Sequence, residues 1–175
     1  MLSLYHKIAS IRRTVIDPAD LNCPDNVVSV GQKVEVKIRR LFSGSLAIRE
    51  VDAGSSNAEE QELTALSNCF YDVERFGVHF VASPRHADML LVTGPVSRNM
   101  AAALKATYEA TPEPKIVVAV GDGAIDGGIF RGSYGIVGGV DQVIPVHFCI
   151  PGDPPSPKQV LCALLKILSI LDQKS

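Results

Sequence analysis

The feature that most constrains the fold is an apolar run at residues 115–120, in which only the first residue, Lys115, is polar. An apolar run of this length is typical of a strand that helices cover on both faces of a sheet. A helix is predicted just before it, at residues 97–109, where Met100, Leu104 and Tyr108 recur every four residues. A buried strand next to such a helix predicts a parallel sheet with right-handed crossovers.

Other short β-rich runs alternate with segments of helical pattern along the chain. The predicted strands lie at residues 33–39, 46–51, 78–82, 89–93 and 142–150, and further helices at residues 57–66 and 157–171. Ser55 or Ser56 is expected to cap the first of these helices. We expect an α/β fold of three layers, with a flavodoxin-like, mostly parallel sheet and helices on both faces. Residues 33–175 are predicted to form one domain, and residues 1–32 an irregular lead-in.

The composition excludes several classes of function. The chain has 175 residues, 46% of them hydrophobic and 21% charged, with a formal net charge of −2. This balance favours a globular protein and gives no electrostatic basis for binding nucleic acid. No apolar run approaches the ~18 residues of a membrane-spanning helix. A cytoplasmic protein is therefore expected, with membrane contact only through partners.

The four cysteines show no ligand pattern. Cys23, Cys69, Cys149 and Cys162 form no C-x-x-C pair, and their spacing matches no zinc or ferredoxin site. Nothing in the sequence indicates secretion, so no disulfide framework is expected. Each cysteine is interpreted as a small buried hydrophobe or an inert thiol.

A site in such a fold is expected at the carboxyl ends of the strands. Four segments are predicted to meet there: residues 52–62, 83–88, 121–128 and 151–155. The glycine-rich segment 121–128 lacks Gly-Lys-Ser/Thr and does not match G-x-G-x-x-G followed by a helix, which argues against phosphate binding. His79 and His147 fall in predicted strands and are interpreted as structural histidines.

The same segments carry a family resemblance. The strings REVDAGSSNAEEQEL (residues 49–63), SPRHAD (83–88), VTGPV (92–96), VGDGAIDGG (120–128) and PGDPPSP (151–157) resemble the small subunit of group 4 NiFe hydrogenases, including formate hydrogenlyase. They also resemble the homologous 20 kDa subunit of NADH:quinone oxidoreductase. The resemblance implies a subunit that holds one 4Fe–4S cluster at its contact with a large subunit.

All four cluster ligands that the resemblance implies are replaced. The cysteine positions fall on Ser56, Glu59, Gly123 and Asp153, and the expected lining residues on Glu60, Arg85, His86 and Asp122. A cluster needs thiolates at its irons, which a hydroxyl, two carboxylates and a glycine do not supply. We expect no cofactor, no bound metal and no catalytic residue.

Two questions about these residues stay open in the sequence. Ser56, Glu59, Asp122 and Asp153 present oxygen atoms that could hold Mg²⁺ or Ca²⁺, although polar filling of a vacated pocket is preferred. Arg85 is expected to pair with Glu59 or Asp153.

The leading hypothesis for function is a cluster-less structural or assembly subunit of a hydrogenase-like or NADH:quinone-oxidoreductase-like membrane complex. Its partners would be a hydrogenase-like large subunit and other complex subunits, with self-association when isolated. Its family is one of oxidoreductases, but no redox activity of its own is expected. The alternatives are an electron-transfer subunit with an atypically ligated iron–sulfur centre, and a free-standing flavodoxin-like binding module.

Overall fold

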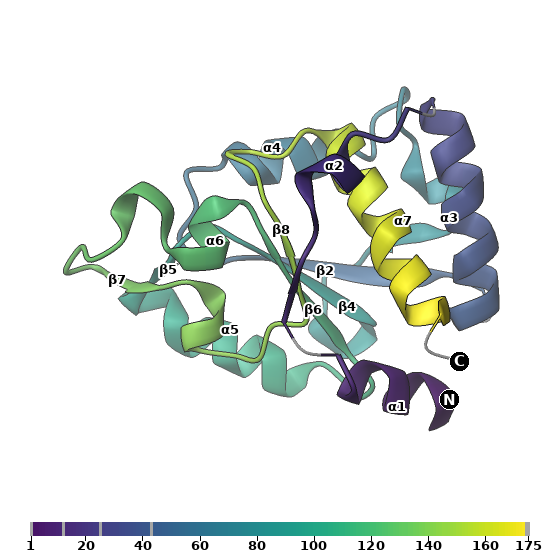
Figure 1. The fold of residues 1–175 in the computed structure, drawn as a ribbon. Helices are drawn as coiled ribbons and strands as arrows, with labels where there is room; N and C mark the ends of the chain where they lie inside the picture. Colours follow the sequence, from purple (N-terminus) through teal and green to yellow (C-terminus); the bar gives the residue numbers. More distant parts are fainter. Residues whose placement is uncertain (1, 12, 25, 43, 174–175) are drawn as a thin grey trace.

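The computed structural model describes residues 2–11, 13–24, 26–42 and 44–173. Its main element is a six-stranded sheet in the order β1-β8-β6-β4-β2-β3, in which every neighbouring pair is parallel (Figure 1). The strands are β1 (Thr14–Val15), β2 (Leu46–Asp52), β3 (Val78–Phe80), β4 (Met89–Thr93), β6 (Ile116–Val120) and β8 (Phe148–Ile150). A separate antiparallel pair, β5 (Val96–Ser97) and β7 (Ile136–Gly138), lies beyond the carboxyl ends of the sheet.

The strand order confirms the predicted flavodoxin-like sheet. Without β1, the order β3-β2-β4-β6-β8 is the 2-1-3-4-5 arrangement of flavodoxin-like folds. In this arrangement the chain changes direction across the sheet between β2 and β4. Ligands bind such folds in the crevice outside the carboxyl ends of those strands.

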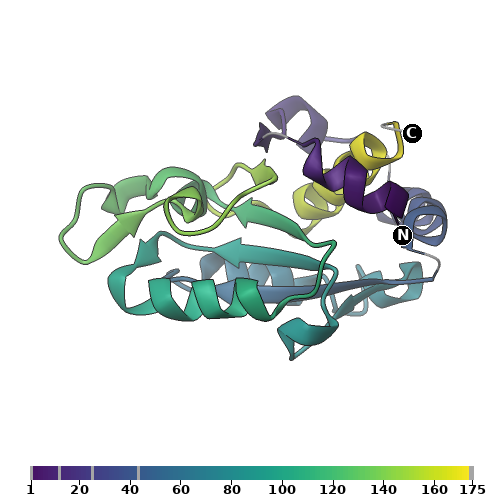
Figure 2. The ribbon, with the colours of Figure 1, turned by 90° about the horizontal axis from the view of Figure 1, so that it is seen from below.

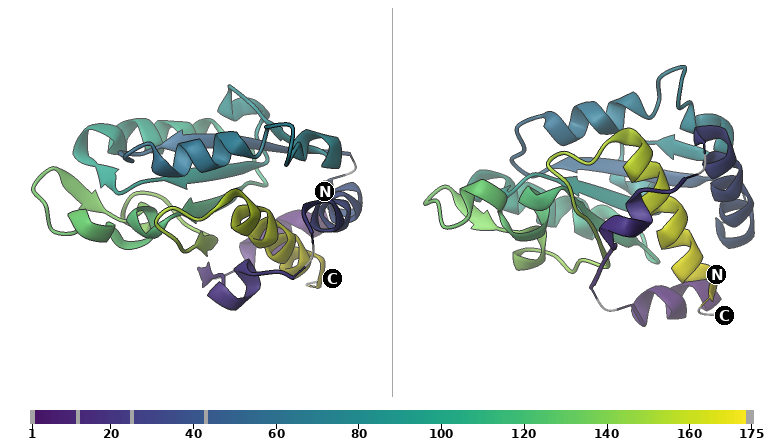
Figure 3. Two further views of the ribbon diagram at one scale, coloured as in Figure 1. Left: turned by 90° about the horizontal axis from the view of Figure 1, so that it is seen from above. Right: turned by 45° about the horizontal axis from the view of Figure 1, so that its top comes forward.

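Helices cover both faces of the sheet, which makes the predicted three layers (Figure 2). On one face α3 (Val27–Phe42) and α7 (Pro157–Gln173) pack side by side (Figure 3), and on the other lies α5 (Arg98–Ala110). The remaining α-helices are α1 (Leu2–Ala9), α2 (Pro18–Leu21), α4 (Ala58–Ala65) and α6 (Asp122–Asp126). Short 3-10 turns occur at Val73–Phe76, Pro84–His86, Gly128–Phe130 and Val140–Gln142. Among the described helices, none is both long and apolar enough to cross a membrane.

The predicted strand at residues 33–39 is wrong, because these residues lie inside α3. The alternation of Val34, Val36 and Ile38 suggested a strand, but Val36 is 67% exposed while Val34 and Ile38 are fully buried. Val30, Val34 and Ile38 recur every four residues, which is close to the helical period, and they pack toward α7. The strand predicted at residues 142–150 is also shorter, since only Phe148–Ile150 pairs with β6.

The irregular lead-in predicted for residues 1–32 differs from the structure as well. α1, β1, α2 and the start of α3 fall in this region, and β1 extends the sheet beside β8. Asp17 caps α2 by accepting a hydrogen bond from the Ala19 nitrogen at 2.8 Å. The polar residues that predicted turns here therefore cap a short helix instead.

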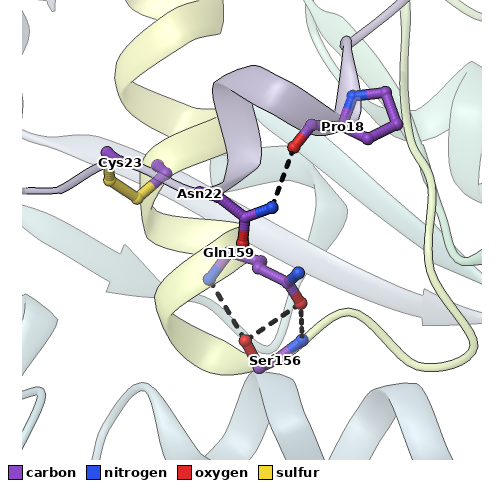
Figure 4. Close-up of a disulfide and its surroundings, with 6 residues drawn as sticks. Pro18, Asn22, Cys23, Ser156 and Gln159 are labelled. Atoms are coloured by element: carbon purple, nitrogen blue, oxygen red, sulfur yellow. Dashed lines mark hydrogen bonds between the residues drawn. A yellow bond between two sulfur atoms is a disulfide. The ribbon is translucent and has the colours of Figure 1, made fainter.

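The expectation of no disulfide is also overturned. Cys23, just after α2, is bonded to Cys162 in α7, 139 residues further along the chain (Figure 4). The two Cα atoms are 6.2 Å apart, within the range of protein disulfides. Of the other cysteines, Cys149 is buried in β8 as expected, whereas Cys69 is exposed.

Candidate functional site

The candidate site lies at the carboxyl ends of β2, β4, β6 and β8, on the left in Figure 1. There the loops that follow these strands enclose a cavity of about 150 Å³. All four predicted cluster-ligand positions line it, together with six neighbours: Ser56, Glu59, Gly123 and Asp153, and Pro95, Asp122, Gly127, Gly128, Ile129 and Phe130. The fold therefore brings together four residues that span 98 positions of sequence, from 56 to 153.

The loop after β2 is shaped by its own polar side chains. Asp52 accepts hydrogen bonds from the backbone nitrogens of Gly54 and Ser55, at 2.7 and 2.8 Å. Ser55 Oγ then accepts from the Asn57 nitrogen at 2.9 Å, one residue before α4 begins. The N-cap of α4 is Asn57, without a side-chain cap, so the prediction that Ser55 or Ser56 caps this helix is wrong; Ser55 instead closes the turn before it, and Ser56 is exposed at the mouth of the cavity.

Glu59 is the most deeply placed of the four. Only 5% of it is exposed, although it carries a carboxylate. Ser55 Oγ donates to its Oε2 atom at 3.2 Å. Its Oε1 atom lies against Gly121, where an added Cβ would come within 2.6 Å. Gly121 leaves room for this carboxylate, and its φ of +87° independently favours glycine.

The turn after β4 packs directly on the loop after β2. A Cβ added at Gly94, whose φ is +70°, would lie 2.3 Å from the Ser55 backbone. Only glycine permits both this conformation and this approach. Pro95 follows and lines the cavity, with its Cδ 2.9 Å from where a Cβ at Gly123 would stand. The sequence predicted only a turn at Gly94 and Pro95, and the contact of Pro95 with the cavity was missed. The position of this turn, after a strand at the ligand-binding edge, was the signal that could have indicated it.

Two hydrogen bonds join the loop after β6 to the loop after β8. The Asp122 nitrogen donates to the Gly152 oxygen at 2.9 Å, and the Gly152 nitrogen donates to Asp122 Oδ1 at 3.0 Å. The Asp122 side chain thus holds the loop that carries Asp153 next to the loop that carries Gly123. Asp153 itself is exposed at the rim of the cavity.

Glu60 belongs to a neighbouring cavity rather than to this one. That second cavity, of about 350 Å³, is lined by Glu60 together with Arg49, Glu50, Leu63, Thr64, Ser67, Phe80, Val81 and Ala82. Glu60 accepts a hydrogen bond from Thr93 Oγ1 and lies 2.5 Å from Ser55 Oγ, whose single proton is shared between Glu60 and Glu59. Burial raises the pKa of the adjacent Glu50 carboxyl, and the Glu60 carboxylate raises it further.

Arg85 and His86 lie away from the site. They form a 3-10 turn before β4, and the following Asp88 bonds to Ala47 at the amino end of β2. Phe80 and Met89 both pair with Ile48, four residues before Asp52 ends β2. Four residues of strand span about 13 Å, so Arg85 and His86 lie away from the carboxyl edge, although Val81 and Ala82 at the start of the same loop line the neighbouring cavity with Glu60. Among the ion pairs of the described residues, Arg85 forms none with Glu59 or Asp153.

The residues present do not fit a 4Fe–4S cluster. The four positions around the cavity carry a hydroxyl, two carboxylates and a glycine, and no thiolate. Cys149 lies inside β8 and Cys69 is exposed beyond α4, while Cys23 and Cys162 are bonded to each other. In the described part of the chain, no three His, Cys, Asp or Glu side chains are grouped so as to hold a metal ion.

Comparison with known proteins shows the family of the chain. Residues 57–167 match the family described as "NADH ubiquinone oxidoreductase, 20 Kd subunit". The chain belongs to this family. The matched range begins at Asn57, one residue after Ser56, and ends in α7, so it includes Glu59, Gly123 and Asp153.

The relatives of this family member include subunits of hydrogenases. It is 44% identical over 143 residues to the probable membrane-bound hydrogenase subunit mbhJ of Pyrococcus furiosus, covering 80% of this chain and 86% of that protein. It is 37% identical over 157 residues to formate hydrogenlyase subunit 7 of Escherichia coli, covering 90% of this chain but only 60% of that protein. An uncharacterized protein of Methanocaldococcus jannaschii is 48% identical over 123 residues, or 70% of this chain and 82% of its own.

A solved structure shares the fold. It is a chain of the membrane-bound sulfane sulfur reductase, an archaeal respiratory membrane complex, with a TM-score of 0.67 and 32% sequence identity. The match covers 80% of this chain and 76% of that one. The predicted fold and the predicted family are both confirmed.

Proposed function

We propose that this chain is a structural subunit of a membrane complex of the hydrogenase or NADH:quinone oxidoreductase type, and that it holds no 4Fe–4S cluster. The observation that carries the proposal is the side chains around the cavity, where Ser56, Glu59, Gly123 and Asp153 stand at the four positions that the family resemblance assigns to cysteines. Its partners are a hydrogenase-like large subunit and other complex subunits. It is cytoplasmic and reaches the membrane through that complex.

The loops keep their places through contacts within the chain. Asp122 fastens the loop after β8, and the Gly94 turn packs on Ser55. These contacts need no cofactor, which supports a scaffold that is stable without a cluster. A restored side chain at position 123 would require Pro95 to move, since a Cβ there comes within 2.9 Å of its ring.

An apolar surface beside the cavity supports an assembly role. Ile129 is 88% exposed and Tyr134 is 92% exposed, and Phe130 and Val137 of the same segment are also exposed. Large apolar side chains gathered on one segment mark a surface for another protein. This segment runs from the 3-10 turn after α6 to β7, so it projects from the same edge of the sheet as the cavity.

Iron and acid-labile sulfide analysis of anaerobically purified protein tests the absence of a cluster. We expect substoichiometric iron and sulfide in the native chain. The matched comparison is the variant with Ser56→Cys, Glu59→Cys, Gly123→Cys and Asp153→Cys, which should take up about four irons on reconstitution if the cavity is a former cluster site.

Two outcomes would overturn the proposal. Stoichiometric iron and sulfide in the native chain would favour an electron-transfer subunit with an atypically ligated cluster. A stable monomer that carries flavin or nucleotide absorbance, and that no membrane complex retains, would favour a free-standing binding module.

A further inference from the structure

The cavity concentrates negative charge without a cation to balance it. Glu59, Asp122 and Asp153 all line it. None of the three takes part in an ion pair with the residues that the structure describes. Glu59 accepts from the Ser55 hydroxyl, and Asp122 accepts from the Gly152 backbone nitrogen. The charge is therefore available to a group from outside the chain.

Glu59 gives the more specific signal. It is 95% removed from solvent, since only 5% of the residue is exposed. Of its two oxygens, Oε2 receives one hydrogen bond, from Ser55 Oγ at 3.2 Å, and Oε1 receives none from the described residues. A buried carboxylate is costly unless donors or a cation satisfy it. Among the described residues Oε1 has no donor, and because it is not fully buried it keeps some solvent contact beside the cavity that Glu59 lines.

The shape of the cavity suits a long cationic side chain better than a metal ion. Its volume of about 150 Å³ is roughly five times the ~30 Å³ that a water molecule occupies in the liquid. Pro95, Ile129 and Phe130 line it with apolar atoms that suit a methylene stem, and Glu59, Asp122 and Asp153 line it with carboxylates that suit a charged end. No described group of three or more ligating side chains is spaced to enclose a metal ion.

We infer that this cavity receives the side chain of an arginine or lysine from the partner subunit. The cationic head reaches Glu59 at the inner wall, and Asp153 contacts it at the rim. The exposed Ile129 and Phe130 then pack on apolar surface around that residue. This inference rests on the proposed function, because it supplies the chemistry of contact between a cluster-less subunit and its partner.

A titration of the isolated chain tests the pocket without knowledge of the partner. The probes are N-acetyl-arginine amide and N-acetyl-citrulline amide, which differ in charge but hardly in shape. We expect the arginine probe to shift the amide signals of Glu59, Gly123 and Asp153 in NMR spectra, with saturation at millimolar concentration. The citrulline probe should leave them unchanged.

Matched variants locate the response. Glu59→Gln with Asp153→Asn should abolish the shifts, while Glu109→Gln, an exposed carboxylate on α5, should leave them intact. The Glu59→Gln substitution preserves shape, and a thermal melt confirms that each variant folds. Equal shifts with both probes would overturn the inference. So would the absence of any shift with the arginine probe at concentrations up to 50-fold above the expected midpoint of the titration.

Co-purification from membranes of the native host separates this inference from the proposed function. We expect Glu59→Lys to reduce the partner subunit recovered with the tagged chain by about tenfold or more, since it places like charges together. If the unaltered chain recovers no membrane complex, the proposed function fails. If the unaltered chain and the Glu59→Lys variant recover equal amounts of the partner subunit, the inferred arginine or lysine contact is wrong while the proposed function stands. The same holds if the native complex carries a stoichiometric metal ion in this cavity.

Discussion

His147 shows how a single side chain completes the sheet. Its backbone nitrogen donates to the Val117 oxygen at 2.9 Å, and its Nδ1 atom accepts from the Val117 nitrogen at 3.0 Å. The imidazole thus takes the place of a backbone carbonyl next to the β6–β8 ladder. This agrees with the structural role that the sequence suggested. Burial lowers the pKa of His147, because a charged imidazole loses water there and Nδ1 could no longer accept.

The lowered pKa of His147 predicts a pH effect on stability. The neutral form is preferred in the folded state, so its contribution is present above the unfolded pKa of about 6.5 and is lost as pH falls through the folded pKa. We expect His147→Ala to cost about 1–3 kcal/mol at pH 8, since the buried Val117 nitrogen loses its acceptor. Urea unfolding at pH 8 and pH 5 measures both effects.

The control for His147 keeps the acceptor but removes the titration. His147→Asn offers an amide oxygen to Val117 and should recover most of the stability while losing the pH dependence. The exposed His86→Ala should leave the acid-dependent loss unchanged. The same acid-dependent loss in His147→Asn would contradict the assignment.

The raised pKa of Glu50 predicts that stability depends on pH in the opposite direction. Its Oε1 atom is buried without a hydrogen-bond partner, and burial followed by repulsion from Glu60 raises its pKa. A carboxyl with a raised folded pKa lowers stability as pH rises from the unfolded pKa of about 4.5 through the folded value. We expect Glu50→Gln to stabilise the fold at pH 7 by on the order of 0.5 kcal/mol, because solvent screens this half-buried group. The difference should vanish near pH 4 in thermal melts, and a constant difference at both pH values would argue against the charge as its cause.

At the scale of elements, most of the secondary structure could be predicted from apolar pattern. β2, β4, β6, α5 and α7 were all expected within one to two residues of their bounds. The failure at residues 33–39 came from too short a window. The alternation of Val34, Val36 and Ile38 matches the period of a strand. The four-residue spacing of Val30, Val34 and Ile38, which is that of a helix, appears only when a longer stretch is considered.

The end of α5 depends on a buried lysine that follows it. Lys115 is 5% exposed, and its Nζ donates to the Tyr108 and Thr111 oxygens, both at 2.8 Å, with the Tyr108 ring centroid 4.1 Å away. Thr111 is the C-cap residue of α5, and its oxygen lies past the last helical partner, while the Tyr108 oxygen also accepts from the Thr111 nitrogen at 3.3 Å. We expect Lys115→Met to cost about 1–3 kcal/mol in urea unfolding, because the Thr111 carbonyl loses its donor and the Tyr108 carbonyl loses one of two.

Lys105 provides the control for this capping contact. It is exposed on the same helix, so Lys105→Met should change stability by less than about 0.5 kcal/mol. Equal effects of the two substitutions would show that Lys115 contributes through charge alone and not through capping.

At the scale of the whole molecule, the disulfide joins distant parts of the chain. It ties the segment after α2 to α7 across 139 residues (Figure 4). A crosslink that closes so long a loop removes much of the entropy of the unfolded chain, which corresponds to roughly 3–5 kcal/mol. We expect the oxidised protein to show two free thiols, to rise to four on reduction, and to melt at lower temperature with reductant.

The exposed Cys69 serves as the comparison for the disulfide. Cys69→Ser should remove one thiol and leave melting unchanged, whereas Cys23→Ser should reproduce the effect of reductant. Four free thiols in protein purified without reductant, with melting that does not respond to it, would contradict the crosslink.

The sequence by itself determined the fold class and the family, and it predicted which four positions line the cavity. Apolar periodicity specifies which residues must be buried, and short motifs such as those at residues 52–59 and 151–155 depend on local geometry. Both kinds of signal are local, so they survive in the sequence. The shared carboxyl edge of the strands predicted that their loops meet, and the family resemblance singled out Ser56, Glu59, Gly123 and Asp153 in them.

Tertiary structure alone decided which loops meet and which charges remain unpaired. The loop with Arg85 follows a strand as the others do, but β3 pairs only with Leu46–Ile48 of β2, so Arg85 lies away from the carboxyl edge of the sheet. Pro95 instead reaches the cavity, and Cys23 meets Cys162, because register and crossover place them there. Such contacts join residues far apart in the chain, where spacing carries no information, and the buried, half-satisfied carboxylate of Glu59 became visible only once its surroundings were complete.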